Sequence, residues 1–216
     1  MVKVEKGDFI QVDFVGRLKE NNKIFDLTDE ELAKQDNIHN PRANYGPLVI
    51  CIGHGQLLKG LEEELIGKEI GKEYKIELKA EKAFGNKNAK LIKVVPSTKF
   101  RKEKLNPFPG LHVNVDGLLA TVKSVSSGRI ILDFNHPLAG KNVVYEVKLI
   151  KKITSLDEQV KSIVQLVLGI KDFEVEIKDK KVNLKIKEKL PKEAVKAIEE
   201  HIKRLVKADE VMIAVE

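Results

Sequence analysis

The sequence contains one cysteine, no tryptophan and few aromatic residues of any kind, and it has no long apolar run. A single cysteine excludes an internal disulfide framework, which favours a reducing cytoplasm as the location. No stretch approaches the roughly 18 consecutive apolar residues that a membrane-spanning helix needs. The first five residues, Met-Val-Lys-Val-Glu, lack the apolar centre of a signal peptide. We therefore expect a cytoplasmic protein that has no membrane partner.

Ligand-binding signatures are also scarce. The histidines are scattered, without the spacing of metal ligands, so no metal site is expected; they are His39, His54, His112, His136 and His201. Gly53 and Gly55 lack the surrounding residues of a P-loop or dinucleotide fingerprint, which argues against phosphate binding by this loop. Cys51 lies within an apolar run, where inert packing is favoured over a reactive thiol. No cofactor is expected.

Charge is abundant and unevenly placed. The chain carries a net charge of +6, and residues 86–128 hold eight basic and two acidic side chains, which accounts for the whole excess. A segment with its own charge is a candidate for its own structure and partner. This segment lacks an RNA-recognition motif, so nucleic acid is a disfavoured partner.

The N-terminal part predicts a strand, a turn and a second strand. Residues 8–15 alternate between apolar and polar side chains and are expected to end at Gly16. Asn21-Asn22 is typical of a turn, and residues 24–26 follow it. Residues 29–34 predict one short helix inside a polar loop.

The next part predicts a strand, a short helix and another strand. Residues 48–52 form an apolar run of strand length. Apolar residues then recur at helical spacing over 57–66, with Glu62 assigned to the polar face, and Gly67 stands where a C-cap glycine belongs. Alternation over 74–80 indicates a half-buried strand. Such a helix is expected to lie across the face of a sheet.

These segments resemble the FKBP-type peptidyl-prolyl isomerases. Residues 53–63 contain three features of the family: glycines at the end of a strand, a pair of apolar residues, and Glu-Glu at the start of a helix. Residues 14–26 contain its aromatic-x-Gly and Phe-Asp elements. Residues 83–85 match its Ala-aromatic-Gly loop. Residues 133–140, Asp-Phe-Asn-His-Pro-Leu-Ala-Gly, are similar to the SlyD-like branch with its long, archaeal-type members. The resemblance implies an α+β fold: an FKBP half-barrel, an antiparallel sheet with a short helix across it, with an inserted β-rich flap.

The resemblance also implies the domain boundaries. The isomerase domain would comprise residues 1–85 and 129–153, with alternation over 143–149 supplying its closing strand, and the flap would comprise 86–128. Residues 154–216 lie outside the resemblance, and their pattern predicts a small independent α-β-β-α-β domain that begins at a capping box from Ser155. Dimerisation, client binding and docking on a partner are all compatible with that domain.

A proline-binding cleft follows from the resemblance, residue by residue. Asp26, Phe84 and Tyr145 would be catalytic, with Asp26 as the one carboxylate near the reacting amide. The lining would be Phe14, Phe25, Leu48, Ile50, Leu57, Leu58 and Leu61. Taken without the resemblance, these apolar residues are explained by core packing, and Asp26 by capping of a turn.

Two residues depart from the family pattern. Phe14 and Phe84 stand where many members carry tyrosine, and Phe84 has no hydroxyl to donate to a substrate carbonyl. We therefore expect a working but modest isomerase on short peptides. No nucleophile is needed, because the reaction is rotation about an amide whose barrier is about 18–20 kcal/mol.

The flap would capture unfolded polypeptide and deliver it to the cleft, as the resemblance implies. Its expected client-binding residues, which packing within the flap also explains, are Val94, Val95, Phe100, Leu105, Phe108 and Leu111. The expected function is peptidyl-prolyl isomerisation that accelerates proline-limited folding, combined with chaperone activity. The partners would be unfolded or proline-containing polypeptides, and ribosomes or nascent chains are compatible with the same reasoning. The alternative is a non-catalytic holdase.

Overall fold

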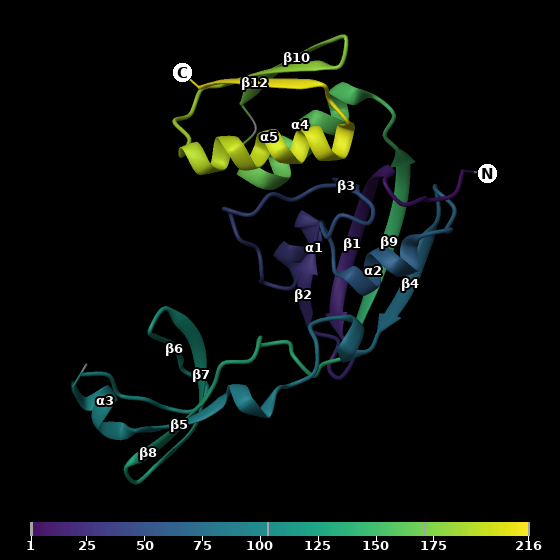
Figure 1. The fold of residues 1–216 in the computed structure, drawn as a ribbon. Coiled ribbons are helices and arrows are strands. Elements are labelled where there is room, and N and C mark those ends of the chain that lie inside the picture. The colour runs from purple at the N-terminus through teal and green to yellow at the C-terminus, as the bar shows by residue number, and fades with distance from the viewer. Residues whose placement is uncertain (1, 103, 171, 216) are drawn as a thin grey trace. The chain divides into compact units, whose positions relative to one another are not determined.

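The computed structural model describes residues 2–102, 104–170 and 172–215, and the chain divides into two compact units. The first unit comprises Met1–Leu78 and Val143–Glu216, and the second comprises Lys79–Asn142. Figure 1 draws the elements of both units. No helix in the described ranges is long and apolar enough to cross a membrane.

The first unit is built on a five-stranded antiparallel sheet. Its strands are β1 (Phe9–Leu18), β2 (Ile24–Leu27), β3 (Leu48–Cys51), β4 (Glu73–Leu78) and β9 (Val143–Lys152). The sheet order is β2-β1-β9-β4, and β3 also pairs with β1. Two short helices, α1 (Glu30–Gln35) and α2 (Lys59–Leu65), belong to the same part of the chain. The mixed α+β character agrees with an FKBP fold.

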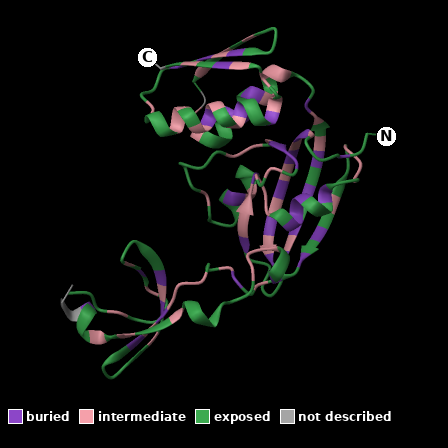
Figure 2. Cartoon of the chain, viewed as in Figure 1, coloured by how far each residue is buried: buried purple, intermediate pink, exposed green. Residues whose placement is uncertain are grey.

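Alternation decides which face of this sheet is buried. Along β9 the odd-numbered residues from Val143 to Leu149 are buried, while Glu146 and Lys148 are exposed (Figure 2). The expectation that Gly16 ends β1 is wrong, because the strand continues to Leu18. Its pairing with β2 shifts register after Gly16, so the glycine lies at an irregularity inside the strand.

The second unit has its own sheet and its own core. Its elements are the 3₁₀ turns η1 (Ala80–Lys82) and η2 (Ala89–Leu91), the strands β5 (Ile92–Pro96), β6 (His112–Val115), β7 (Leu118–Ser126) and β8 (Arg129–Asp133), and the helix α3 (Ser97–Lys102). The antiparallel order is β5-β8-β7-β6. The unit is wider than the expected range of 86–128, because β8 pairs with β5 and β7 here and not with the isomerase sheet.

Hydrogen bonds close the base of this second unit. The Gly140 amide donates to the Gly85 carbonyl at 2.8 Å, and the Ala80 amide donates to the side chain of Asn142 at 2.9 Å. Farther along both segments, the Asn135 side chain accepts from the Asn88 amide at 2.8 Å and donates to the Asn88 carbonyl at 3.1 Å. Asn135 of the Asp-Phe-Asn-His string, together with Gly140 and Asn142, therefore joins the two chain segments that enter and leave the unit.

The C-terminal part has the predicted element order. It consists of α4 (Leu156–Leu168), β10 (Phe173–Lys178), β11 (Lys181–Ile186), α5 (Lys192–Val206) and β12 (Glu210–Val215). Ser155 caps α4 at its start, and Gly169 adopts the left-handed conformation at its end. The strands form a sheet in the order β10-β11-β12, with β12 parallel to β11.

This C-terminal part shares a core with the isomerase sheet. Buried residues of α4 and α5, such as Ile163 and Ile202, cluster with Phe9 of β1 and Cys51 of β3. Val49 of β3 packs against the same cluster. The two helices therefore cover β3, and the expected independence of residues 154–216 does not extend to their packing.

Candidate active site

The Tyr145 hydroxyl donates a 3.2 Å hydrogen bond to Oδ2 of Asp26, although the two residues are 119 positions apart in the chain. The sheet brings them together, because Gly16 of β1 pairs with Asp26 on β2 and with Tyr145 on β9. Residues paired across neighbouring strands project to the same face. The missing side chain at Gly16 leaves the space in which the carboxylate and the phenol meet.

Aromatic rings surround this hydrogen bond. Phe14 and Phe25 each contact the Tyr145 ring edge-on, with centroid distances of 5.8 and 5.7 Å. Edge-to-face packing is the favoured arrangement of such rings. Tyr145 is almost fully buried, so its position is determined by the rings and by Asp26 together.

Burial alters the protonation of both partners. Removal from water raises the pKa of Asp26, and the hydrogen bonds from Tyr145 and from the Leu27 amide oppose this effect only in part. Burial is also the main cause that raises the pKa of Tyr145, followed by the negative charge of Asp26 and the hydrogen bond to it. The phenol is therefore a hydrogen-bond donor throughout the working pH range.

The apolar lining residues belong to β3 and to the start of α2. Ile50 and Leu61 are buried, whereas Leu48, Leu57 and Leu58 remain partly accessible. The expected cleft residues other than Phe84 all belong to the first unit, and Phe25 and Asp26 are partly accessible as Leu48, Leu57 and Leu58 are.

Glu62 holds the loop that leads into α2, and its role was missed in the sequence. Its carboxylate accepts from the backbone amides of Gly53, Gly55, Gln56 and Leu57 at distances of 2.8–3.2 Å. Glu62 is only 4% exposed, so its assignment to the polar face is wrong. The helical spacing gave no signal for this role, because the four amides belong to the loop before α2 and not to its first turn.

Phe84, the third expected catalytic residue, belongs to the second unit. Its ring stacks on that of His136, with a centroid distance of 4.7 Å and an interplanar angle of 3°. Phe84 is partly accessible, and the adjoining Gly85 takes part in the closure at the base of the unit.

The expected client-binding residues of the flap divide into two groups. Phe100 is buried in the core of the second unit, and Val95 and Leu111 pack against that core. Val94, Leu105 and Phe108 are exposed, as are four further residues that the sequence analysis did not single out: Leu91, Leu118, Leu119 and Val125. The exposed group forms the accessible apolar surface of the unit.

A cavity of about 890 Å³ lies against the outer face of the isomerase sheet. Its walls include Asp13 and Val15 of β1 and Glu146 and Lys148 of β9, which alternate with the buried residues and so belong to the outer face of the sheet. Of the expected cleft residues, Phe14 is part of this wall. Ion pairs such as Lys148–Glu73 cross the same face.

Comparisons with known proteins identify the family. A short-type peptidyl-prolyl cis-trans isomerase from Methanocaldococcus jannaschii is 34% identical over 146 residues, which cover 68% of this chain and 92% of the relative. A probable FKBP-type 16 kDa isomerase from Pseudomonas fluorescens is 32% identical over 109 residues, 48% of this chain and 71% of the relative. The chain belongs to the FKBP-type peptidyl-prolyl cis-trans isomerases.

The second unit of this FKBP-type isomerase has a family match of its own. Residues 93–138 match the family described as FKBP26, IF domain. A SlyD isomerase from Helicobacter pylori is 29% identical over 128 residues, 58% of this chain and 63% of the relative. The expected membership of the FKBP family with SlyD-like relatives is confirmed.

An isomerase of this family acts on proline-containing polypeptides. Rotation about the X-Pro bond removes amide resonance, and the twisted form has a smaller dipole than the planar form. Apolar, water-poor surroundings therefore favour the twisted amide over the planar one. Side chains alone can provide such surroundings.

Proposed function

We propose that the isomerase cleft is formed by Asp26, Tyr145 and the apolar residues around them. The observation that carries this proposal is the Tyr145–Asp26 hydrogen bond across Gly16, set within aromatic rings. The lining would comprise Phe14, Phe25, Leu48, Ile50, Leu57, Leu58 and Leu61, all of the first unit.

Within this cleft the apolar walls would do most of the work. Tyr145 donates its hydroxyl to Asp26, and Phe84 has no hydroxyl, so neither residue offers a hydroxyl proton to the substrate carbonyl. Asp26 would act by its charge on the twisting amide, at a position that Tyr145 fixes. We therefore propose a modest catalyst on short peptides, whose rate depends on removing the prolyl bond from water.

The second unit would raise the rate on protein substrates by holding them. Its exposed apolar residues Val94, Leu105, Phe108, Leu118 and Leu119 provide a surface for unfolded chains. A chain bound there has a high effective concentration at a cleft in the same molecule, without any new catalytic group. This arrangement would give chaperone activity in addition to isomerisation, with unfolded polypeptides, including nascent chains, as substrates.

Two deletions and two substitutions test the proposal. The Gly85 carbonyl and the Gly140 amide lie 2.8 Å apart, so a deletion of residues 86–139 can join the two glycines directly with little displacement of either segment. We expect this variant to retain activity on short peptides and to lose at least about tenfold in rate on a protein whose refolding is limited by proline isomerisation. Deletion of 86–128 alone would remove β5 and leave β8 without its sheet, which makes it the weaker control.

The substitutions separate capture from catalysis. Phe108→Ser with Leu119→Ser should slow protein refolding and leave peptide turnover unchanged, whereas Asp26→Ala should slow both. An equal loss on peptides and proteins after the deletion would contradict capture by the second unit. Unchanged peptide turnover in Asp26→Ala would contradict the cleft assignment. No acceleration of refolding by the intact chain would favour a non-catalytic holdase.

A further inference from the structure

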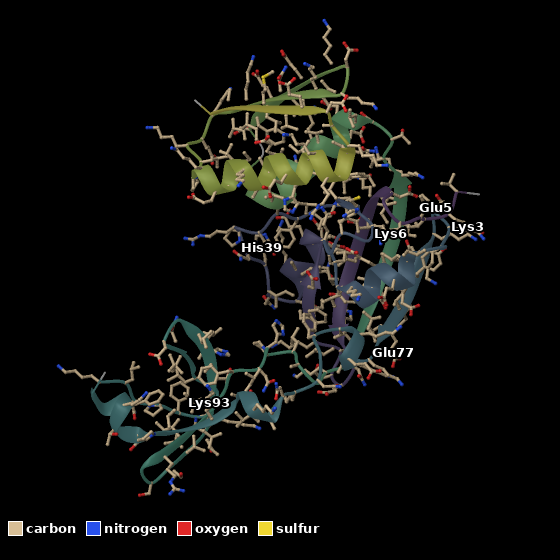
Figure 3. The ribbon with its side chains drawn as sticks, in the orientation of Figure 1. Lys3, Glu5, Lys6, His39, Glu77 and Lys93 are labelled. Carbon is tan, nitrogen blue, oxygen red and sulfur yellow. The ribbon has the colours of Figure 1, made fainter. Side chains whose placement is uncertain are left out.

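A cavity of about 490 Å³ lies where the loop before α2 meets α5, within the first unit. Its walls include Lys6, Lys59 and Arg204, which come from three separate segments: the stretch before β1, the start of α2 and the last turn of α5. A smaller adjoining hollow of about 200 Å³ shares His54 and Arg204 with it. Figure 3 labels Lys6 on the stretch that leads into β1.

These three cations are exposed side chains that form no ion pair within the described part of the chain. Among the residues that the structure describes, none forms an ion pair with Lys6, Lys59 or Arg204, whereas Lys203 beside Arg204 is paired with Glu199 at 2.6 Å. Lys6 is also held in place, because its alkyl chain crosses Gly53 so closely that a Cβ on the glycine would lie 2.7 Å from Cγ of Lys6. Lys6 therefore has a fixed position in the wall of the cavity.

Two carboxylates, Glu62 and Glu63, also line the cavity. Glu62 keeps its charge while both of its oxygens accept from backbone amides of the loop, and Glu63 is exposed as the three cations are, so the lining retains one net positive charge. The imidazole of His54 experiences the excess positive charge. Burial is the first cause that lowers its pKa, and the charges of Arg204 and Lys6 add to it against the opposing charge of Glu62.

We propose that this cavity binds a phosphate-bearing small molecule through Lys6, Lys59 and Arg204. A phosphate group carries enough oxygens to contact three cations at once, and arginine and lysine are its usual side-chain partners. The glycine loop plays a different part from a P-loop, because Glu62 already occupies its amides. The cavity is larger than a single phosphate, which leaves space for an attached organic group. A bound ligand would fasten α5 to the loop before α2.

The test uses the full-length chain with inorganic phosphate or a sugar monophosphate, each compared with chloride at the same ionic strength. Binding should raise the pKa of His54, followed by its imidazole resonances, because an anion offsets the charge of Arg204. It should also raise Tm by about 2–4 °C at saturating ligand. A response to phosphate alone would indicate the free anion, and a stronger response to the sugar phosphate an organic ligand.

Matched variants complete the test. Arg204→Gln and Lys59→Gln should each weaken both responses at least about tenfold in ligand concentration, while Lys196→Gln, an exposed position on α5 outside the cavity, should leave them intact. Arg204→Gln and Lys59→Gln are both included so that a folding defect in one of them does not decide the outcome. The absence of any response beyond chloride, or an equal response in the cavity variants and in Lys196→Gln, would overturn the proposal.

Discussion

Gly16 lies so close to Tyr145 that a Cβ on the glycine would come within 2.9 Å of Cε1 of the tyrosine ring. The same Cβ would lie 3.0 Å from the ring of Phe25. The backbone of Gly16 is not in the left-handed region, so the demand for glycine at this position is one of space. One residue without a side chain thus sets the place where Asp26 and Tyr145 meet.

Gly16→Ala should therefore displace the Tyr145 ring and weaken its hydrogen bond to Asp26. We expect a loss of about 1–3 kcal/mol in the free energy of unfolding, typical of overpacking, together with reduced peptide isomerisation. Denaturant unfolding and a peptide assay measure the two effects. Tyr145→Phe is the control, because it removes the hydroxyl and leaves the ring. If Gly16→Ala matched the wild type in both assays, the ring would not be constrained by the glycine.

Asp26→Asn should change the pH dependence of stability. Burial raises the pKa of Asp26, so the folded chain holds this proton at a pH where the unfolded chain, with its ordinary pKa of 3.8, has lost it. The free energy of unfolding therefore falls as the pH rises through this window. Asparagine does not ionise, so the variant does not undergo this fall in the free energy of unfolding. It should be more stable than the wild type at pH 7. The gain should shrink below the ordinary pKa.

Urea unfolding of both proteins at pH 3 and pH 7 checks this prediction. The amide oxygen of asparagine can still accept from Tyr145, so the comparison isolates the charge. A stability difference that is the same at both pH values would contradict a raised pKa for Asp26.

Glu62→Gln should release the loop before α2. Glutamine offers one acceptor oxygen and turns a donor group toward backbone amides that also donate, so at least two of the four hydrogen bonds are lost. We expect a cost of about 3 kcal/mol, since hydrogen bonds to a buried charged group are strong. Amide hydrogen exchange should accelerate at Gly53, Gly55, Gln56 and Leu57. Glu63→Gln, at the exposed neighbouring position, is the control. If the two variants lost equal stability and showed equal amide exchange in the loop, Glu62 would not be what holds the loop.

Cys51 should be inert as long as the C-terminal helices stay on β3. The thiol is fully buried, and burial, with smaller contributions from Glu62 and Asp8, raises its pKa to about 11. About one thiol in a thousand would be ionised at pH 8, and alkylation requires opening of the shared core. Ile202→Ala, in that core, should accelerate labelling at least about tenfold. Met212→Ala, at an exposed position, should not, and equal rates would mean that access does not involve α5.

Much of the fold was predictable because local patterns determine it. The alternation of β9, the helical spacing of α2 and the capping box at Ser155 each predicted the element that the structure contains. Alternation does not identify a strand's partners, however. Ile130 and Leu132 of β8 are buried as a strand pattern requires, yet their sheet is that of the second unit.

The missing features depend on chain segments that meet only after folding. Nothing near Glu62 in helical spacing indicates that four loop amides turn back toward its carboxylate. Likewise, the apolar run at Val49 and Cys51 predicted a buried strand but not the helices that cover it. Asp26 and Tyr145 were placed in one site by family resemblance, since no local pattern connects residues so far apart. The cleft role of the individual residues stays a prediction.

The position of β9 has a consequence for how the chain folds during synthesis. β9 lies between β1 and β4 in the sheet, yet it follows the whole second unit in the sequence. A ribosome therefore completes the second unit before the central strand of the isomerase sheet exists. Because domains fold as units during translation, the second unit can reach its native state first. The isomerase sheet then closes around the last of its strands to emerge, so Asp26 and Tyr145 come together only after the second unit has been synthesised.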